Sequence, residues 1–483
     1  MGTISSAFDL ISSGLDADQS ALSIVANNVA NANTPGYARE VPNWQENSPV
    51  EINGVSYGAG VTETGPTSVR DSVLDLRLAQ QQQLASASSA RLTALNSIQA
   101  LFTPDSGSSS SAGGDIGTDI TSFFESFSSL EANPADNAYR QQVLSSAKTL
   151  AGNVSNAAAS LESQKAAIDQ DAAGVISQIN ALTTEIAQLN QQIQSTSPDG
   201  EAGVLEDQRV QDISQLSQLI GINQITTENN GLSITTTSGQ LLVSEDTNDA
   251  LTSGITGGVT HLFLGGTDVT TQLASGGGEL GGYLTARDQD ISNALSALDQ
   301  LANQISTSVN SQNNSGTDLD GLEGTGVNSA GVSGTGNSPL YIFTQPTQVA
   351  GSALAMSVVI TDPNQIAAAS FGGGTGDDSN TVAMANLANQ PIVNGQTPSN
   401  YYAQFVSVLG STVSEVQTEN SAQNASVTQL QTQQNALSGV NLNDEASVMQ
   451  QLETSYQAAS QVFSLLNTIM TSALNLGVET AVS

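Results

Sequence analysis

Hydrophobic residues recur every three or four positions at both ends of the chain, in residues 1–40 and 440–483. The N-terminal series is interrupted only at Asp18 and consists of Ile4, Phe8, Ile11, Leu15, Leu22, Val25 and Val29. The C-terminal series is Met449, Leu452, Tyr456, Ala459, Phe463, Leu466, Met470 and Ala473. Apolar residues at this spacing form a stripe along one side of a helix that packs against another helix. We therefore predict two terminal helices that pair with each other or with neighbouring copies of the chain.

Helical and extended stretches alternate between these ends. The N-terminal helix is expected to stop near Asn33, because Pro35 disfavours helix at the preceding residue and Gly36 favours a turn. Further helices are expected at residues 69–102, 168–193, 205–219, 281–310 and 406–437, and extended chain or strands at 41–66, 222–273, 340–343 and 356–360. Polar residues interrupt the apolar stripe of the last of these helices at Asn420, Gln423 and Gln434. Such interruptions set the register of paired helices at a cost in stability.

This order predicts an α+β multidomain protein, in which the N- and C-terminal helices pair as an α-helical coiled-coil rod and β-rich domains are inserted in the middle. We expect a terminal coiled-coil domain from residues 1–40 and 440–483. A helical rod domain is expected from residues 41–221, 281–310 and 401–439. Residues 222–280 are expected to form a β-rich insert, and residues 311–400 a mixed insert rich in glycine and asparagine.

The charge balance narrows the classes of partner. The chain has 45 acidic and 9 basic residues, a formal net charge of -36. Binding to nucleic acid or to anionic lipid needs clustered lysine and arginine, so neither partner is expected. There are no cysteines, so disulfides and thiolate chemistry are excluded. We expect no membrane span, because no run of about 18 apolar residues exists, and no standard secretory signal peptide. Cytoplasmic residence and export by another route both remain open.

Candidate catalytic and metal-binding residues are few. A Ser-His-Asp triad would have to use the single histidine, His261, which lies in an alternating segment typical of a strand. Asp377 and Asp378 are expected to lie in a flexible solvated loop, since glycines precede them. The segment from Asp318 to Gly321 is expected to be a turn, because no glutamate follows at calcium-loop spacing. We therefore predict no enzymatic activity, no cofactor and no metal.

The N-terminal helix is expected to be marginally stable alone. No lysine or arginine occurs between Met1 and Ala38, so no ion pair between successive turns supports it. Such a helix gains stability mainly by burying its apolar stripe. We therefore expect mobile termini in the free monomer and ordered helices after polymerisation.

The segment from Asn27 to Arg39, Asn-Asn-Val-Ala-Asn-Ala-Asn-Thr-Pro-Gly-Tyr-Ala-Arg, closely resembles the N-terminal signature of bacterial flagellar rod, hook and hook-associated proteins. Segments that look like those of hook-associated members at the hook–filament junction lie at residues 204–209, 216–221, 282–288, 360–370, 377–380, 439–446 and 456–460. The resemblance extends from Ser6 to about Leu476. It departs from the family at residues 461–463 and 317–339.

The resemblance implies a structural subunit that leaves the cell through the flagellar type III export channel and forms a ring-like helical layer on the hook. Its implied partners are further copies, the hook protein, the second hook–filament junction protein and a cytoplasmic export chaperone. The chaperone would bind residues 437–476, which include Leu437, Leu442, Val448, Leu452, Val462 and Leu466. The subunit interface would comprise both apolar stripes and the signature residues Asn27, Asn28, Asn31, Pro35, Gly36 and Tyr37.

Two questions remain open at this point. The three signature asparagines either bond across subunits or cap the end of their own helix, since asparagine favours both. Alternative functions are a hook or distal-rod subunit of the same family or, outside it, a secreted adhesin or hydrolase. The long central insert and the segment Asp207-Gln208-Arg209 argue against a hook or rod subunit. An adhesin or hydrolase would leave the two terminal stripes unexplained.

Overall fold

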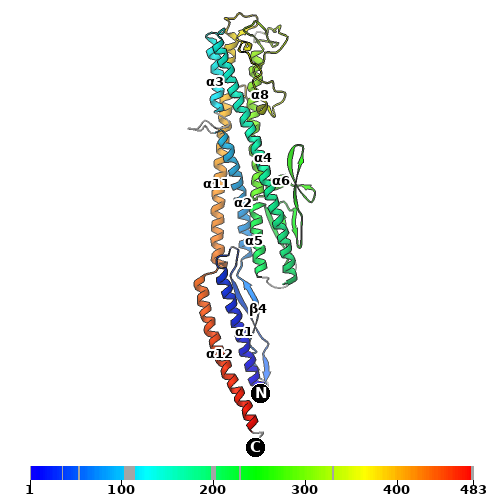
Figure 1. Ribbon diagram of the computed structural model, residues 1–483, viewed down its shortest axis with the longest axis vertical. Coiled ribbons are helices and arrows are strands. Elements are labelled where there is room, and N and C mark those ends of the chain that lie inside the picture. Colours follow the sequence, from blue (N-terminus) through cyan, green and yellow to red (C-terminus); the bar gives the residue numbers. More distant parts are fainter. Residues whose placement is uncertain are drawn as a thin grey trace.

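The structure, a computed structural model, is an elongated rod with both chain termini at one end (Figure 1). It describes residues 2–34, 36–52, 55–102, 115–196, 203–227, 230–328 and 331–479, with side chains except those of residues 2–5, 52, 474 and 476–479. It is mostly helical with several small sheets. The expected fold class, paired terminal helices with β regions inserted between them, is confirmed.

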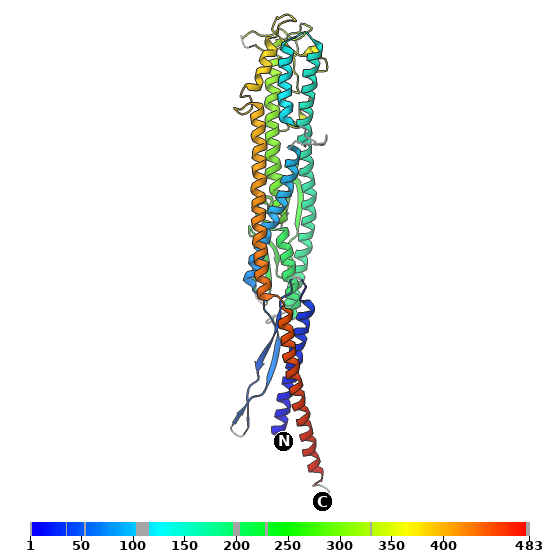
Figure 2. The same cartoon turned by 90° about the vertical axis from the view of Figure 1, so that its left-hand side faces the viewer.

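The terminal helices are α1 (Gly2–Asn31) and α12 (Leu442–Glu479), which lie side by side at the lower end of the rod (Figures 1 and 2). Helix α1 ends two residues before the position expected from Pro35 and Gly36. An antiparallel ribbon follows, in which β1 (Glu40–Glu46) pairs with β4 (Val61–Ser68). Its outer part pairs β2 (Val50–Ile52) with β3 (Val55–Tyr57). The ribbon leads directly into the helical bundle.

The bundle contains the five long helices α2 (Ser72–Phe102), α3 (Ile116–Glu131), α4 (Asn137–Thr196), α8 (Ser292–Asn313) and α11 (Pro398–Ser438). Its core is fully buried around Phe123, whose ring packs against those of Phe127 and Phe343. The sequence patterns did not lead us to predict helix α3 or the first half of α4. The signal was present, since the buried residues of α3 recur at helical spacing: Ile116, Ile120, Phe123, Phe127 and Leu130.

Polar side chains cross the contact between α2 and α11. Asn420 donates to Ser88 Oγ at 3.1 Å, and Gln434 Nε2 donates to Asp75 Oδ1 at 2.5 Å. Gln423 accepts a hydrogen bond from Gln81. The three interruptions of the α11 stripe therefore each face a polar partner on α2. Such pairs fix the register of the two helices, because a slip would leave their groups unpaired.

The β-rich insert begins after α5 (Val204–Leu219). One sheet contains β5 (Ile222–Thr226), β6 (Leu232–Thr236), β7 (Leu241–Ser244) and β8 (Thr247–Asn248), in that order. A second sheet contains β9 (Leu251–Thr256), β10 (Val259–Leu264) and β11 (Thr267–Asp268), and α6 (Thr270–Ala274) follows.

Asparagines of α4 attach this insert to the bundle. Asn190 Nδ2 donates to the carbonyls of Leu232 and Glu245, each at 2.7 Å, and Asn180 makes two hydrogen bonds with the backbone of Leu251. Because these bonds satisfy backbone groups of β6, of β9 and of the turn after β7, they fix the insert against the long helix.

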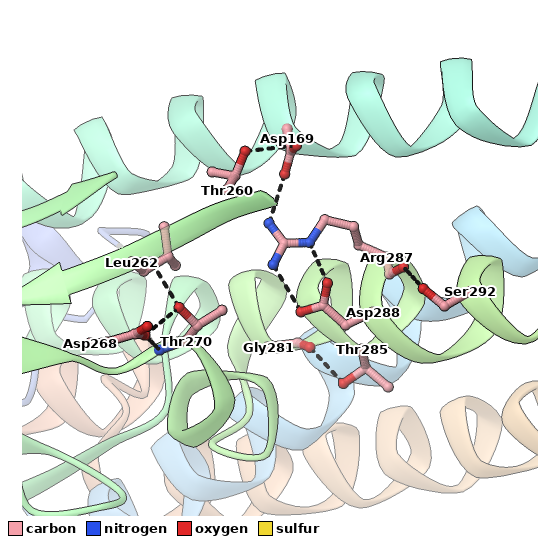
Figure 3. Close-up of polar contacts among 10 residues, drawn as sticks. All are labelled: Asp169, Thr260, Leu262, Asp268, Thr270, Gly281, Thr285, Arg287, Asp288 and Ser292. Atoms are coloured by element: carbon pink, nitrogen blue, oxygen red, sulfur yellow. Dashed lines mark hydrogen bonds and ion pairs between the residues drawn. The ribbon is translucent and has the colours of Figure 1, made fainter. Parts of the chain in front are cut away.

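A π-helical segment, η1 (Ala286–Ile291), lies between α7 (Gly278–Thr285) and α8. Arg287, which is 1% exposed, donates to Asp169 of α4 at 2.7 Å and to both carboxylate oxygens of Asp288 (Figure 3). Asp169 also accepts from Thr260 of β10 at 2.9 Å. The arginine thus joins the π segment to α4 and, through Asp169, to the β-rich insert.

Residues 311–400 form the far end of the rod. The elements there are β12 (Gly316–Thr317), α9 (Ser352–Ala355), η2 (Pro363–Gln365), β13 (Ala369–Ser370), α10 (Ser379–Asn386) and η3 (Leu387–Asn389). The strands expected at 340–343 and 356–360 are wrong, because these segments share only an isolated bridge between Phe343 and Val358. Two backbone hydrogen bonds, from Thr344 to Ser357 and from Val359 to Ile342, flank this bridge. The Asn310 side chain of α8 also bonds the backbone of Ile342 and Phe343.

One buried carboxyl makes the rod sensitive to pH. Asp212 of α5 is 6% exposed, and its Oδ2 has no hydrogen-bond partner within the described residues. Burial, and then the charge of Glu185 on α4, raise the pKa of Asp212 from 3.8 to about 6. Because the fold favours the protonated form, stability is lost as the pH rises from about 4 through 6.

We expect Asp212→Asn to have little effect at pH 4 and to raise the free energy of unfolding at pH 8 by about 2 kcal/mol, since one pKa unit corresponds to about 1.4 kcal/mol. Urea unfolding at both pH values measures this difference. Asp246→Asn, at an exposed position, is the matched control. Equal effects of Asp212→Asn at both pH values would contradict the assignment.

Candidate assembly site at the paired termini

The two predicted apolar stripes meet in part. In α1, Val25 is buried, Val29 is 38% exposed, and the half-buried members are Phe8, Ile11, Leu15 and Leu22. In α12, Leu452 is buried, Tyr456 and Ala473 are exposed, and the half-buried members are Met449, Ala459, Phe463, Leu466 and Met470. The rings of Phe8 and Phe463 are 4.4 Å apart. The side chain of Ile4 and the whole of Pro35 lie outside the described residues.

The buried contact between the helices is small. Ala21, Val25 and Leu452 form its cluster, and Leu22 and Met449 pack against it. Ala17, Ala21 and Ile24 are also buried but were missed in the sequence. Ala17, Ala21 and Ile24 are spaced four and three residues apart, which is helical spacing. They form a second row beside the predicted stripe of Leu15 and Leu22, so the prediction from that stripe did not include them.

Asn28 connects the two ends of the chain. Its Nδ2 donates to the Glu40 carbonyl at 2.8 Å and to Glu445 Oε2 of α12 at 3.2 Å. Its Oδ1 accepts from the Tyr37 hydroxyl at 2.7 Å and from the Glu40 backbone N–H at 2.9 Å. The side chain is 1% exposed and uses its full hydrogen-bonding capacity within the chain. It therefore fixes α1, the start of the ribbon and the first turn of α12 relative to one another.

The other signature residues act locally. Asn31 Nδ2 donates to Asn27 Oδ1 at 2.9 Å, and Asn31 Oδ1 accepts from Thr34 at 3.1 Å. Gly36 adopts a φ of +81° and lies against Gln211 of α5. The partners observed for Asn27, Asn28 and Asn31 lie within the chain. A contact with a neighbouring subunit stays a prediction.

Arginines fasten the terminal unit to the bundle. The Arg39 backbone N–H donates to the Ser438 carbonyl at 2.9 Å, and its guanidinium lies 3.9 Å from Glu445. Arg70 donates to the Gly36 carbonyl at 3.1 Å and pairs with Asp75 and Asp207.

Burial dominates the electrostatics of this junction. It raises the pKa of Asp75 and of Asp207, and the nearby Arg70 opposes the rise in both. Burial also raises the pKa of the Tyr37 hydroxyl, and the charge of Glu40 adds to the effect. Tyr37 therefore remains a neutral donor to Asn28.

A second apolar stripe on α12 faces solvent. Val462, Leu465 and Ile469 are 46%, 61% and 45% exposed and lie three and four residues apart, beside the stripe that meets α1. Of the predicted chaperone-binding residues, Leu437, Leu442, Val448 and Val462 are exposed, whereas Leu452 is buried and Leu466 is half-buried. The α12 helix thus has one covered and one open apolar face.

The other chemical candidates have structural roles. His261 Nδ1 lies 2.6 Å from Asp268 Oδ2 on the neighbouring strand. Asp318 accepts from the backbone of Asp320 and Leu322 and closes a turn, as expected. Within the described ranges, no cluster of three histidine or acidic residues suits a metal.

Asp377 lies in a loop, as expected, but it is half-buried and is not free in solvent. Its carboxylate accepts hydrogen bonds from the backbone and hydroxyls of Ser370 and Ser379. These bonds hold the pKa of Asp377 well below its usual range.

Comparisons with known proteins agree with this architecture. A model of flagellar basal body rod proteins matches residues 10–37, and a model of the helical domain of the flagellar hook-associated protein FlgK matches residues 105–328. Flagellar hook-associated protein 1 of Escherichia coli K12 is 26% identical over 546 residues, with 96% of this chain and 98% of the relative covered. The Bacillus subtilis protein of the same name is 25% identical over 505 residues, covering 95% and 96%. The chain belongs to the flagellar hook-associated protein 1 family.

A solved structure supports the same fold. The flagellar hook junction protein FlgK from Burkholderia pseudomallei matches 75% of this chain and 100% of its own, with a TM-score of 0.63 and 19% identity. By its similarity to these relatives, the chain is a structural, non-enzymatic and extracellular axial component of the flagellum. Among the residues that the structure describes, no helix is long and apolar enough to cross a membrane.

We expect Asn28→Ala to lower the free energy of unfolding of the terminal unit by about 2–4 kcal/mol, because it leaves several buried polar groups unpaired. Faster amide hydrogen exchange in α1, the ribbon and the first turns of α12 is the measured result. Asn33→Ala, an exposed position in the same motif, is the control. Unchanged exchange in the Asn28 variant would show that the hydrogen bonds do not hold the ends together.

Proposed function

We propose that α1 and α12 form the surface through which this junction protein assembles between the flagellar hook and filament. Membership of the hook-associated protein 1 family makes the chain a structural component of the hook–filament junction, which assembles with hook and filament components. The observation that supports the proposal is the open apolar face of α12, formed by Val462, Leu465 and Ile469. Contiguous apolar surface of this kind marks an interaction site.

The position of this apolar face also suggests which proteins contact which part of the chain. We propose that copies of the chain pack side by side into a helical ring, with residues 1–40 and 440–483 as the assembly unit. Residues 41–221, 281–310 and 401–439 then form the rod domain, and residues 222–280 and 311–400 its two inserts. The hook protein would contact one end of the ring and the second hook–filament junction protein the other.

The interface residues divide into two groups on this proposal. Asn28 and Tyr37 position the terminal unit from within, while the stripe residues of α1 and α12 contact neighbours. Exposed members such as Val29, Tyr456 and Ala473 are available to a neighbouring subunit without rearrangement. For Asn27, Asn31 and Gly36 the proposed role is to shape the exit from α1.

An export chaperone would use the same helix before assembly. Leu437, Leu442, Val448 and Val462 are accessible, but Leu452 is buried against α1 and Leu466 is half-buried. A chaperone that binds all six must therefore displace α1 from α12. This exchange suits a small buried contact, because separating the helices exposes few fully buried side chains.

We expect Leu465→Asp to leave the fold intact and to reduce incorporation into the hook–filament junction on the order of tenfold or more, because burying an unpaired charge costs several kcal/mol. Cells that carry only this variant should have hooks without filaments and lose flagellin to the medium. Gln457→Asp adds the same charge on the polar face of α12 and should assemble normally. Normal filaments with Leu465→Asp would refute the proposed surface.

A further inference from the structure

The ribbon formed by β1 to β4 carries large apolar side chains in solvent. Trp44, Val50, Val55 and Tyr57 are 47%, 47%, 52% and 52% exposed. Val50 lies directly opposite Tyr57 across the strands, so these two side chains form one exposed pair. Trp44 is the only tryptophan of the chain.

The base of this ribbon is fixed, but its outer part has little support. Asn28 holds the backbone of Glu40 at the base, and Gly60 lies close to Leu10 and Ser13 of α1. Figure 2 shows the far end of the ribbon standing apart from both terminal helices. An isolated two-stranded ribbon is marginally stable in water, and covering its apolar residues would stabilise it.

The middle of the ribbon has the chemistry to bind an arginine. Trp44 lies directly opposite Glu63, so an indole ring and a carboxylate are neighbours on adjacent strands. A guanidinium stacks on an indole face and pairs with a carboxylate at the same time. Glu63 makes no hydrogen bond or ion pair within the described part of the chain, and Glu46 and Glu51 add negative charge nearby.

Six of the seven arginines are already engaged within the chain. They are Arg39, Arg70, Arg91, Arg140, Arg209 and Arg287. Arg77 is the exception: it is exposed and makes no hydrogen bond or ion pair with any residue that the structure describes. It lies near the start of α2, a helix that begins four residues after the last residue of the ribbon, Ser68. Because α2 runs from the junction away from the ribbon (Figure 2), a neighbouring copy displaced along the rod places its Arg77 beside this ribbon.

We propose that the β1–β4 ribbon docks on a second copy of this chain, and that Trp44 and Glu63 receive Arg77 of that copy. The opposite charges of the ribbon and Arg77 favour a second copy over a partner with an acidic surface. This inference rests on the proposed assembly function, but it concerns a contact separate from α12. It assigns a use to the one arginine that has no partner among the residues that the structure describes.

Charge reversal tests the pairing in the full-length protein expressed in cells that lack their own copy. We expect Arg77→Glu to reduce the amount retained on isolated hooks by about tenfold, since both the ion pair and the cation–π contact are lost. Combining it with Glu63→Arg should restore retention. Lys148→Glu makes the same charge change at another exposed position and should have no effect.

Trp44 provides a second readout, because its fluorescence belongs to a single site. Its emission should shift to shorter wavelength when the wild-type protein assembles, and should not shift with Arg77→Glu. Wild-type retention of Arg77→Glu would overturn the docking proposal. Loss of retention without rescue by Glu63→Arg would overturn the pairing. Failure of the α12 surface is distinguishable, since Leu465→Asp would then assemble normally whatever the behaviour of Arg77→Glu.

Discussion

The hydrogen bonds of Asn28 are the constraint on which the lower end of the rod depends. One buried amide bonds to the chain 12 residues later at Glu40 and 417 residues later at Glu445. The N-terminal helix, the ribbon and the C-terminal helix are thereby held at one point, next to the place where Arg39 meets Ser438. Because buried polar groups are costly to leave unpaired, these bonds specify one arrangement of the two ends. The orientation of α1, α12 and the ribbon relative to the bundle follows from it.

The bundle and the terminal unit differ in how much they bury. The bundle has an extensive core around Phe123, Phe127 and Phe343, whereas the buried cluster between α1 and α12 consists of Ala21, Val25 and Leu452. Helices with so little buried surface have low local stability and gain it from neighbours. The strongly negative charge of the chain also affects how copies come together. A net charge of -36 keeps free copies apart, and the few arginines are used as internal fasteners, as at Arg70 and Arg287. Assembly must therefore bring apolar faces and the remaining cations together.

Much of this architecture could be predicted from the sequence, because helical and strand periodicity survives in the terminal helices, in α11 and in the β-rich insert. The polar interruptions of α11 also indicated paired helices, and each faces a polar residue of α2. Other features could not be predicted in this way. Residues 340–343 look like a strand, but their pairing with residues 357–359 is limited to one bridge, and the Asn310 side chain bonds their backbone as well. A single side chain of this kind leaves no periodic signal. The partner of Asn28 is equally hidden, since nothing near Asn28 in the sequence indicates Glu445. The π segment at Arg287 depends on contacts with α4 that are likewise distant in sequence.

Amide hydrogen exchange, measured on the free chain and on the chain attached to hooks, tests most directly whether the termini depend on their neighbours. In the free chain we predict faster exchange in α1 and α12 than in the core helices α3, α4 and α8. After attachment, α1 and α12 should become as well protected as the core. Terminal helices that are already fully protected in the free chain, with no change on attachment, would contradict the account.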